Sequence, residues 1–356
     1  MDPTILNRRL VRPRRVEAIP VSKSRPATID MANMAAQDNC ALFAKLPGEI
    51  RRLIFADALA PQDDVDKPYR PDRGYYRPGQ HFHPKTSVAL LQTCKRIFEE
   101  ARLLPVRQAT FRFWWMRGPW MFMRSHRNGE FRVDLWQESL SEEQKAHVQS
   151  VQVFAQQYIL EQAHTIAVDR MPETGPLGFA TKHFHLTLRN SDWWSWESPI
   201  ESSDRLGICP WLRGRVSQQE MLAQPLRIPL EKLREHLHKG TWGWHICQLK
   251  GLQRLEIEFE TDLLKRGQVE KVLERAKHWI FPLADRSGIM VKTGDVVESE
   301  WEGVAHTTYD HILQATESQI PQGAPTRTHY VALMTWTAAS ETSEQYISMV
   351  ADELST

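Results

Sequence analysis

Residues 255–260 alternate strictly between apolar and acidic side chains. Such a period of two places the two kinds of side chain on opposite faces only in an extended strand. An apolar stripe at helical spacing follows, and short apolar stretches at 289–291 and 330–336 have strand character. This order of strand, helix and strand predicts a sheet covered by a helix. The prediction rests on Leu255, Ile257 and Phe259 of the strand and on Val269, Val272, Leu273, Ala276, Trp279 and Ile280 of the helix, which we expect to run until Pro282.

The acidic side chains of this strand are Glu256, Glu258 and Glu260, and we expect them to face solvent. A docking strip for a basic partner is the alternative. Ser141 and Gln144 form a capping box that predicts a short helix. Alternating patterns predict further strands at 111–115, 131–135, 151–153 and 183–189, and the polar or proline-rich stretches 61–86, 169–181, 198–228 and 293–327 are predicted loops.

Two apolar helical segments precede these strands. The first begins near Pro47, which suits a first turn because it lacks an N–H, and ends at Pro61. Its apolar residues recur at helical spacing: Ile50, Leu53, Ile54 and Ala58. The second segment begins at Thr86 or Ser87, carries a wide apolar stripe and ends at Pro105. We expect the two helices to pack against each other.

Composition excludes several classes of protein. The 356 residues are 41% hydrophobic and 25% charged, which is ordinary for a globular chain, and the formal net charge of +1 gives no overall attraction to nucleic acid. No apolar run is long enough to cross a bilayer, so we expect no membrane partner and a cytoplasmic or nuclear location. The charge is uneven, because residues 1–35 hold seven Lys and Arg against three acids, a net of +4.

The two helical segments carry a family resemblance. Leu46-Pro47-x-Glu49-Ile50-Arg51-x-x-Ile54, then Leu90-Leu91-x-Thr93-Cys94-x-x-Ile97-x-x-Glu100-Ala101, resembles the F-box-like domain of uncharacterised filamentous-fungal proteins. The segment Asp192-Trp193-Trp194-x-Trp196-Glu197 is similar to a D-W-W-x-W-E stretch in some of those proteins. An F-box docks on the Skp adaptor of a cullin–RING ubiquitin ligase, and the resemblance implies no catalytic residues. The long 61–86 stretch between the helices departs from the compact F-box pattern.

Together these patterns predict an α+β fold. A small F-box-like helical N-terminal module at 41–115 is expected to pack, as one compact unit, on a mixed β-sheet with covering helices at 116–338. Residues 1–40 are predicted to form a disordered basic tail, and residues 339–356 a C-terminal tail or short helix.

Two groups of residues are candidate sites within the sheet region. His183 and His185 share one face of a predicted strand and are weak candidates for a metal site, which would need further ligands such as the nearby glutamates. Trp193, Trp194 and Trp196 either bury their rings in the core or form a recognition surface for a base, a sugar or a proline-rich peptide.

The motifs of common enzymes are absent from the sequence: it has no G-x-S-x-G, H-E-x-x-H, P-loop or G-x-G-x-x-G. We therefore expect a non-catalytic interaction protein without a cofactor, in which Leu46, Pro47, Ile50 and Ile54 dock a protein partner, with the Skp-type adaptor as the candidate. The alternatives are an enzyme or a metal or small-molecule binder with a His/Glu site, and nucleic-acid contact through the basic tail.

Overall fold

The structure is a computed structural model, and it describes residues 35, 37–71, 75–114, 140–161, 181–235, 238–285, 288–305 and 326–340. The chain divides into two units, of which the first ends at Ala36 and the second begins at Gln37. All structural statements below concern the second unit. The strand predicted at 131–135, most of the predicted basic tail and most of the C-terminal tail lie outside the described residues.

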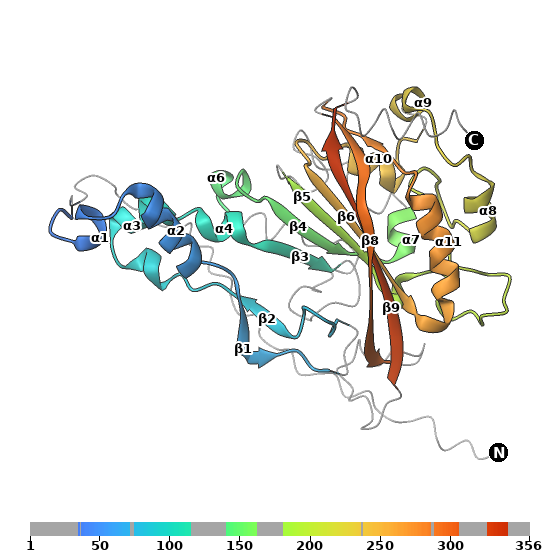
Figure 1. Cartoon of the computed structure of the whole chain (residues 1–356), viewed down its shortest axis with the longest axis horizontal. Helices are drawn as coiled ribbons and strands as arrows, with labels where there is room; N and C mark the ends of the chain where they lie inside the picture. The colour runs from blue at the N-terminus through green and yellow to red at the C-terminus, as the bar shows by residue number, and fades with distance from the viewer. Residues whose placement is uncertain are drawn as a thin grey trace, which may run out of the picture. The chain divides into compact units, whose positions relative to one another are not determined.

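The sheet holds seven described strands in the order β3-β4-β5-β6-β9-β8-β7, which confirms the mixed α+β class (Figure 1). The first four strands are parallel to one another, whereas the pairs β6–β9, β9–β8 and β8–β7 are antiparallel. β9 therefore lies between β6 and β8, and β8 and β9 are the longest described strands. The strands are β3 (Thr110–Trp114), β4 (Ser150–Phe154), β5 (His183–Leu188), β6 (Arg254–Asp262), β7 (Phe281–Pro282), β8 (Ile289–Val304) and β9 (Thr326–Ala339).

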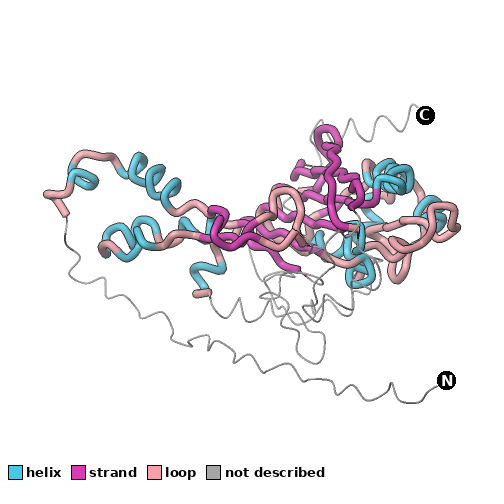
Figure 2. The backbone as a smooth tube through the Cα atoms, turned by 90° about the horizontal axis from the view of Figure 1, so that it is seen from below, coloured by secondary structure: helices cyan, strands magenta, loops and turns pink. Residues whose placement is uncertain are grey.

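One face of the sheet carries the main core. The apolar side chains of β6 are buried there beside Met334 and Trp336 of β9, as the alternation predicts. Helix α11 (Arg266–Ala276) buries its predicted stripe against the same cluster, but it ends at Ala276 rather than running to Pro282, which lies in β7. The other helices after β4 are α7 (Gln157–Glu161), α8 (Gln218–Ala223), α9 (Leu230–Arg234) and α10 (Trp242–Cys247), with single 3-10 turns at Asn190–Asp192 and Leu263–Lys265 (Figures 1 and 2).

Strand β8 is much longer than predicted. The sequence suggested a short strand at 289–291 followed by a loop over 293–327, but β8 continues to Val304 and β9 already begins at Thr326. A register shift between Thr293 and Val297 interrupts the ladder, and Gly294 has a φ of 63° there. Such a bulge breaks the alternation of side chains, which is why the pattern did not reveal a continuous strand.

The helical module consists of α1 (Ala41–Ala44), α2 (Gly48–Ala58), the 3-10 turn η2 (Ala89–Gln92), α3 (Lys95–Ala101) and α4 (Leu104–Gln108). The helix predicted after Pro47 is thus confirmed. The single helix predicted from about Thr86 to Pro105 is wrong, because Cys94 is extended and divides it. Pro105 does not end a helix but lies in the first turn of α4, where its missing N–H has no cost.

This module has a small core of its own. Helices α2 and α3 pack together as expected, and Arg51 of α2 donates to both carboxylate oxygens of Glu100 on α3, at 2.9 and 2.8 Å. The buried residues shared by α2, α3 and α4 are Phe55, Leu59, Ile97, Ala101 and Leu104, and none of them belongs to the core of the sheet. Among the described residues, the module therefore has a small core of its own, while Val106 of α4 is buried in the core of the sheet.

The predicted loop at 61–86 contains a two-stranded antiparallel hairpin, β1 (Gln62–Pro68) and β2 (Phe82–Lys85). Pro68 and Pro84 are tolerated because both strands of a two-stranded sheet are edges. The segment between the strands brings Arg77 to the second face of the large sheet.

Candidate functional site

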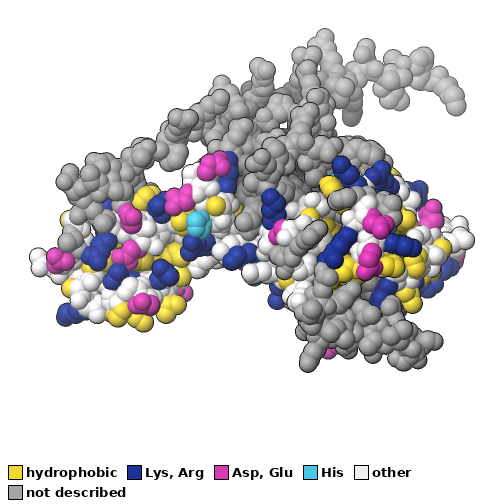
Figure 3. All heavy atoms as spheres, turned by 90° about the horizontal axis from the view of Figure 1, so that it is seen from above, with side chains coloured by type: hydrophobic (Ala, Val, Ile, Leu, Met, Phe, Trp, Pro, Cys, Tyr) yellow, Lys and Arg dark blue, Asp and Glu magenta, His cyan; other side chains and the backbone are white. Residues whose placement is uncertain are grey.

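Helix α2 exposes an apolar surface. Ile50 and Ile54 are each 43% exposed and Leu53 is 67% exposed, so the helix leaves three large apolar side chains in contact with solvent. Pro47 lies at the start of this helix and is exposed, whereas Leu46 is half-buried. We call these five residues the α2 surface. Figure 3 shows exposed hydrophobic side chains among charged ones over the helical segment at the left.

The opposite side of α2 is fixed in place. Phe55 and Leu59 are buried, at 1% and 0% exposed, and lie four residues apart on the side that faces α3 and α4. Arg51 adds its contacts to Glu100 and donates to the backbone oxygen of Leu46 at 2.7 Å. The helix therefore presents Ile50, Leu53 and Ile54 on a face whose orientation the small core determines.

The second face of the large sheet is polar but not solvated. His185 on β5 is paired with Glu256 on β6, and its Nδ1 lies 3.8 Å from the Glu256 carboxylate while its Nε2 lies 3.9 Å from that of Glu258. Burial lowers the pKa of His185, although Glu258 and Glu256 act in the opposite sense. The prediction of a solvated glutamate row is therefore wrong for Glu260, which is 3% exposed.

Arg77 is the reason that these acids can be buried. Its Nη2 lies 2.6 Å from Oε1 of Glu258 and 2.9 Å from Oε2 of Glu260, and Arg77 is only 5% exposed. Burial alone would raise the pKa of Glu260, but the charges of Arg77, His329 and Arg189 and a backbone N–H from Asn190 together lower it. Charges removed from water persist only when they are paired in this way.

The metal candidates occupy different environments. His183 is exposed at the start of β5, and His185 lies in the polar cluster two residues later. Within the described ranges, no three His, Cys, Asp or Glu side chains converge in a way that holds a metal ion. The expected proximity of His185 to the glutamates of β6 is present, but Arg77 is bound to two of those glutamates.

The three tryptophans have different exposures. Trp193 is 2% exposed, packs with Phe259 at 6.0 Å between ring centres and donates from its indole N–H to the backbone oxygen of Glu260 at 2.8 Å. It belongs to the core and forms no surface. Trp194 and Trp196 are half-buried, and both keep part of their rings accessible.

Trp194 hydrogen-bonds to a buried acid, Glu161. Its indole N–H donates to Oε2 of Glu161 at 2.6 Å, and Gln157 donates to Oε1 of the same carboxylate at 2.8 Å. The guanidinium of Arg215 lies over the ring of Trp194, 5.5 Å from its centre. Burial raises the pKa of Glu161 to about 8, against the effect of these donors.

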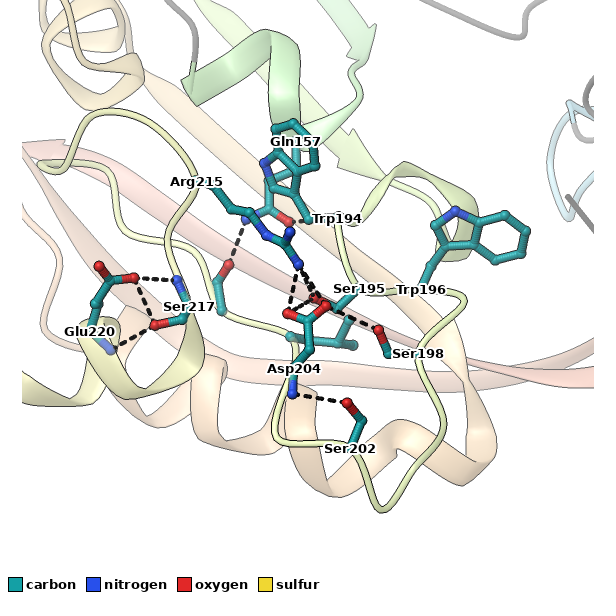
Figure 4. Close-up of polar contacts among 12 residues, drawn as sticks. Gln157, Trp194, Ser195, Trp196, Ser198, Ser202, Asp204, Arg215, Ser217 and Glu220 are labelled. Carbon is teal, nitrogen blue, oxygen red and sulfur yellow. Dashed lines mark hydrogen bonds and ion pairs between the residues drawn. The ribbon is translucent and has the colours of Figure 1, made fainter.

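The loop after Trp196 is tied back to this network. Arg215 pairs with Asp204 at 2.6 Å, and Asp204 accepts from Ser195 at 2.7 Å and Ser198 at 3.1 Å (Figure 4). Lys265 donates to the backbone oxygens of Ser195 and Trp196 at 2.8 and 2.7 Å. The D-W-W-x-W-E segment is thus held in place by hydrogen bonds and ion pairs within the fold, and nearly every polar group in it has an internal partner.

Sequence reasoning missed Arg77, Glu161 and Arg215. Arg77 lies in a proline-rich stretch interpreted as a loop, and no local pattern marks it as the partner of a strand 180 residues away. Glu161 ends a helix of five residues, which is too short to show a periodic signal. The row of glutamates on β6 is a signal for basic partners in the sequence, but its alternation with apolar residues predicts a solvated face.

The chain matches no family model, no curated protein and no solved structure. None of the helices within the described ranges is both long enough and apolar enough to span a membrane.

Proposed function

We propose that this protein is an interaction protein whose α2 surface docks on another protein. The observation that supports the proposal is the exposure of Ile50, Leu53 and Ile54 on one face of a helix whose other face is fixed by Phe55 and Leu59. An amphipathic helix normally buries its apolar stripe, so a second apolar face on the outside favours a partner.

The chemistry of this face favours a protein groove. Branched aliphatic side chains at i, i+3 and i+4 are the anchors with which helices enter apolar grooves, and Pro47 sets the start of the helix beside them. The resemblance of the Leu-Pro segment to F-box-like domains makes a Skp-type adaptor the first candidate, and in that role the chain would be a substrate adaptor of a ubiquitin ligase.

Binding of a purified Skp adaptor tests this proposal with a matched pair of variants. Leu53→Glu places a charge in the centre of the α2 surface, and we expect it to weaken binding by at least about 30-fold, as for an interface hot spot. Leu264→Glu is the control, because Leu264 is 71% exposed and belongs to the 3-10 turn after β6. It should bind as the wild type does.

Three outcomes are informative. Adaptor binding that only Leu53→Glu weakens supports the ligase role. Absence of adaptor binding at micromolar concentrations removes that role. If a partner captured from cell extract is lost from both variants equally, the α2 surface is not the docking site and the proposal fails.

A further inference from the structure

The outer side of β8 is open along most of the strand. β7 pairs only with Ile289 and Met290, and from Val291 to Val304 the described strands leave β8 with β9 as its single neighbour. The segment Asp295–Val304, here called the β8 edge, covers about 30 Å at the rise of an extended strand. Every second residue of such an edge turns its backbone N–H and C=O away from the sheet, where another strand can bind them.

The β8 edge is exposed from Val297 to Glu300, whereas Trp301 is half-buried and Gly303 is buried. Val297 is 63% exposed, and the side chains of Glu298 and Glu300 are 43% and 47% exposed. By contrast, β9 is buried at Tyr330, Val331 and Ala332, opposite these residues. A neighbouring strand would therefore meet solvated backbone groups without displacing a described part of the fold.

Side chains of the β8 edge are sorted by chemistry. Glu298, Glu300 and Glu302 lie on one face, paired with alternate residues of β9, while Val297 and Trp301 lie on the other. Among the described residues, Arg266 partly neutralises these acids, since its guanidinium lies 2.9 Å from Glu298 and 3.7 Å from Glu300. The acidic face thus keeps an excess of negative charge beside backbone groups that no described strand binds.

This charge pattern decides which strand fits. If two copies of the chain paired through this edge, their glutamate rows would approach each other, and like charges on neighbouring strands are destabilising. A strand with Lys or Arg at alternate positions would instead set cations beside Glu298, Glu300 and Glu302. Its intervening side chains would lie beside Val297 and Trp301, which favours apolar residues there.

We propose that the β8 edge binds a basic, extended segment of another protein as an added strand, with alternate cations beside Glu298, Glu300 and Glu302. The backbone ladder supplies the affinity, and the glutamate row selects the charge and the register. This surface is separate from the α2 surface, and the inference does not depend on the adaptor role.

A synthetic peptide of eight residues alternating Lys and Val is the probe, and fluorescence anisotropy with the full chain is the measurement. Two further versions carry backbone N-methyl groups on alternate residues, in opposite phases. We expect one phase to abolish binding and the other to preserve it, because only every second N–H of an added strand points toward β8. Equal binding of both phases, or no binding of the unmodified peptide up to millimolar concentration, would overturn the proposal.

A charge series tests the glutamate row. Glu300→Lys with Glu302→Lys should weaken binding of the Lys-Val peptide at least about tenfold, because like charges would then meet across the interface. The control, Glu201→Lys with Glu235→Lys, makes the same change in net charge at two exposed acids outside β8 and should bind as the wild type does. Leu53→Glu should also leave peptide binding unchanged, which separates this result from failure of the proposed function.

Light scattering measures whether the β8 edge instead pairs with a second copy of this chain. If the chain forms a dimer that Glu300→Lys with Glu302→Lys changes while the Lys-Val peptide does not bind, the edge pairs with a second copy and the proposal is wrong.

Discussion

Arg77 and Glu260 form an ion pair of 2.9 Å in which both residues are almost entirely shielded from solvent. Arg77 comes from the segment between β1 and β2, and Glu260 from the middle of the large sheet. The pair therefore links the segment between β1 and β2 to the large sheet. Its strength depends on mutual neutralisation, because either charge alone would be costly to keep out of water.

Replacing Arg77 by Met should lower the free energy of unfolding by about 3–5 kcal/mol, since Glu258 and Glu260 would lose the cation closest to their carboxylates. Urea denaturation measures the change. Arg254→Met is the matched control, because Arg254 pairs with Glu256 from an exposed position, and its removal should change stability by at most about 1 kcal/mol. Adding Glu260→Gln to Arg77→Met should recover part of the loss, and an equal effect of both single Arg variants would contradict this account.

Glu161 should make the protein less stable as the pH rises. Its pKa in the folded state is about 8, because of burial, whereas an unfolded chain has the ordinary value near 4.3. Between these values the folded state holds a proton that the unfolded state has lost, so stability falls by up to about 1.4 kcal/mol per pH unit.

Glu161→Gln removes this titration while keeping an oxygen that accepts from Trp194. Compared with the wild type, the variant should lose less stability between about pH 5 and about pH 8, as followed by urea denaturation at several pH values. Parallel pH profiles of the two proteins would show that Glu161 is ionised in the folded state at neutral pH.

Two apolar residues on opposite sides of α2 should respond differently to truncation. Phe55→Ala leaves a cavity in the small core of the module and should lower the stability of that module by about 3–5 kcal/mol. Leu53→Ala removes an exposed side chain and should change stability by no more than about 0.5 kcal/mol. Hydrogen exchange of the α2 amides measures the two changes in stability. Similar protection in the two variants would mean that Phe55 is not the side chain that α2 buries.

Two glycines provide a test of close packing. A Cβ on Gly207 would lie 2.6 Å from the Cα of Gln218, a backbone atom that has no room to move, and Gln157 binds the Gly207 oxygen at 2.6 Å. Gly207→Ala should therefore cost about 1–3 kcal/mol through local overpacking. Gly267→Ala, in the first turn of α11 with no atom closer than 4.0 Å, should stabilise the protein by about 0.5 kcal/mol. Thermal unfolding measures both changes, and a shift of the melting temperature in the same direction for the two variants would contradict this account.

The elements with a clean period were predictable from the sequence. The strand at Arg254–Asp262, the strand at His183–Leu188 and the capped helix at Ser141 all follow from local patterns, and the structure confirms them. The long β8 was not predictable, because the bulge at Gly294 breaks its alternation. The divided helix at Cys94 was missed because its apolar residues continue at helical spacing across an extended residue.

Candidate site residues were predictable only where local geometry decides exposure. Helical spacing groups Ile50 and Ile54 on one face of α2, but it does not predict that this face is exposed while Phe55 and Leu59 are buried. Burial of Trp193 and Glu260 depends on contacts with residues far away in the chain, such as the indole N–H that donates to the backbone of Glu260. A period of two separates the faces of a strand, but it does not say whether a polar face is covered by another segment.

The separate core of the helical module also bears on how sequence variation spreads. A substitution at Ile97 or Leu104 must be accommodated by only a handful of neighbours, and no tryptophan of the sheet core is among them. Substitutions in the two clusters can therefore be accommodated largely separately, and α4 connects the clusters because it carries Leu104 of one and Val106 of the other. Residues with which the first helices bind a partner can therefore be substituted while the packing of the sheet core is retained.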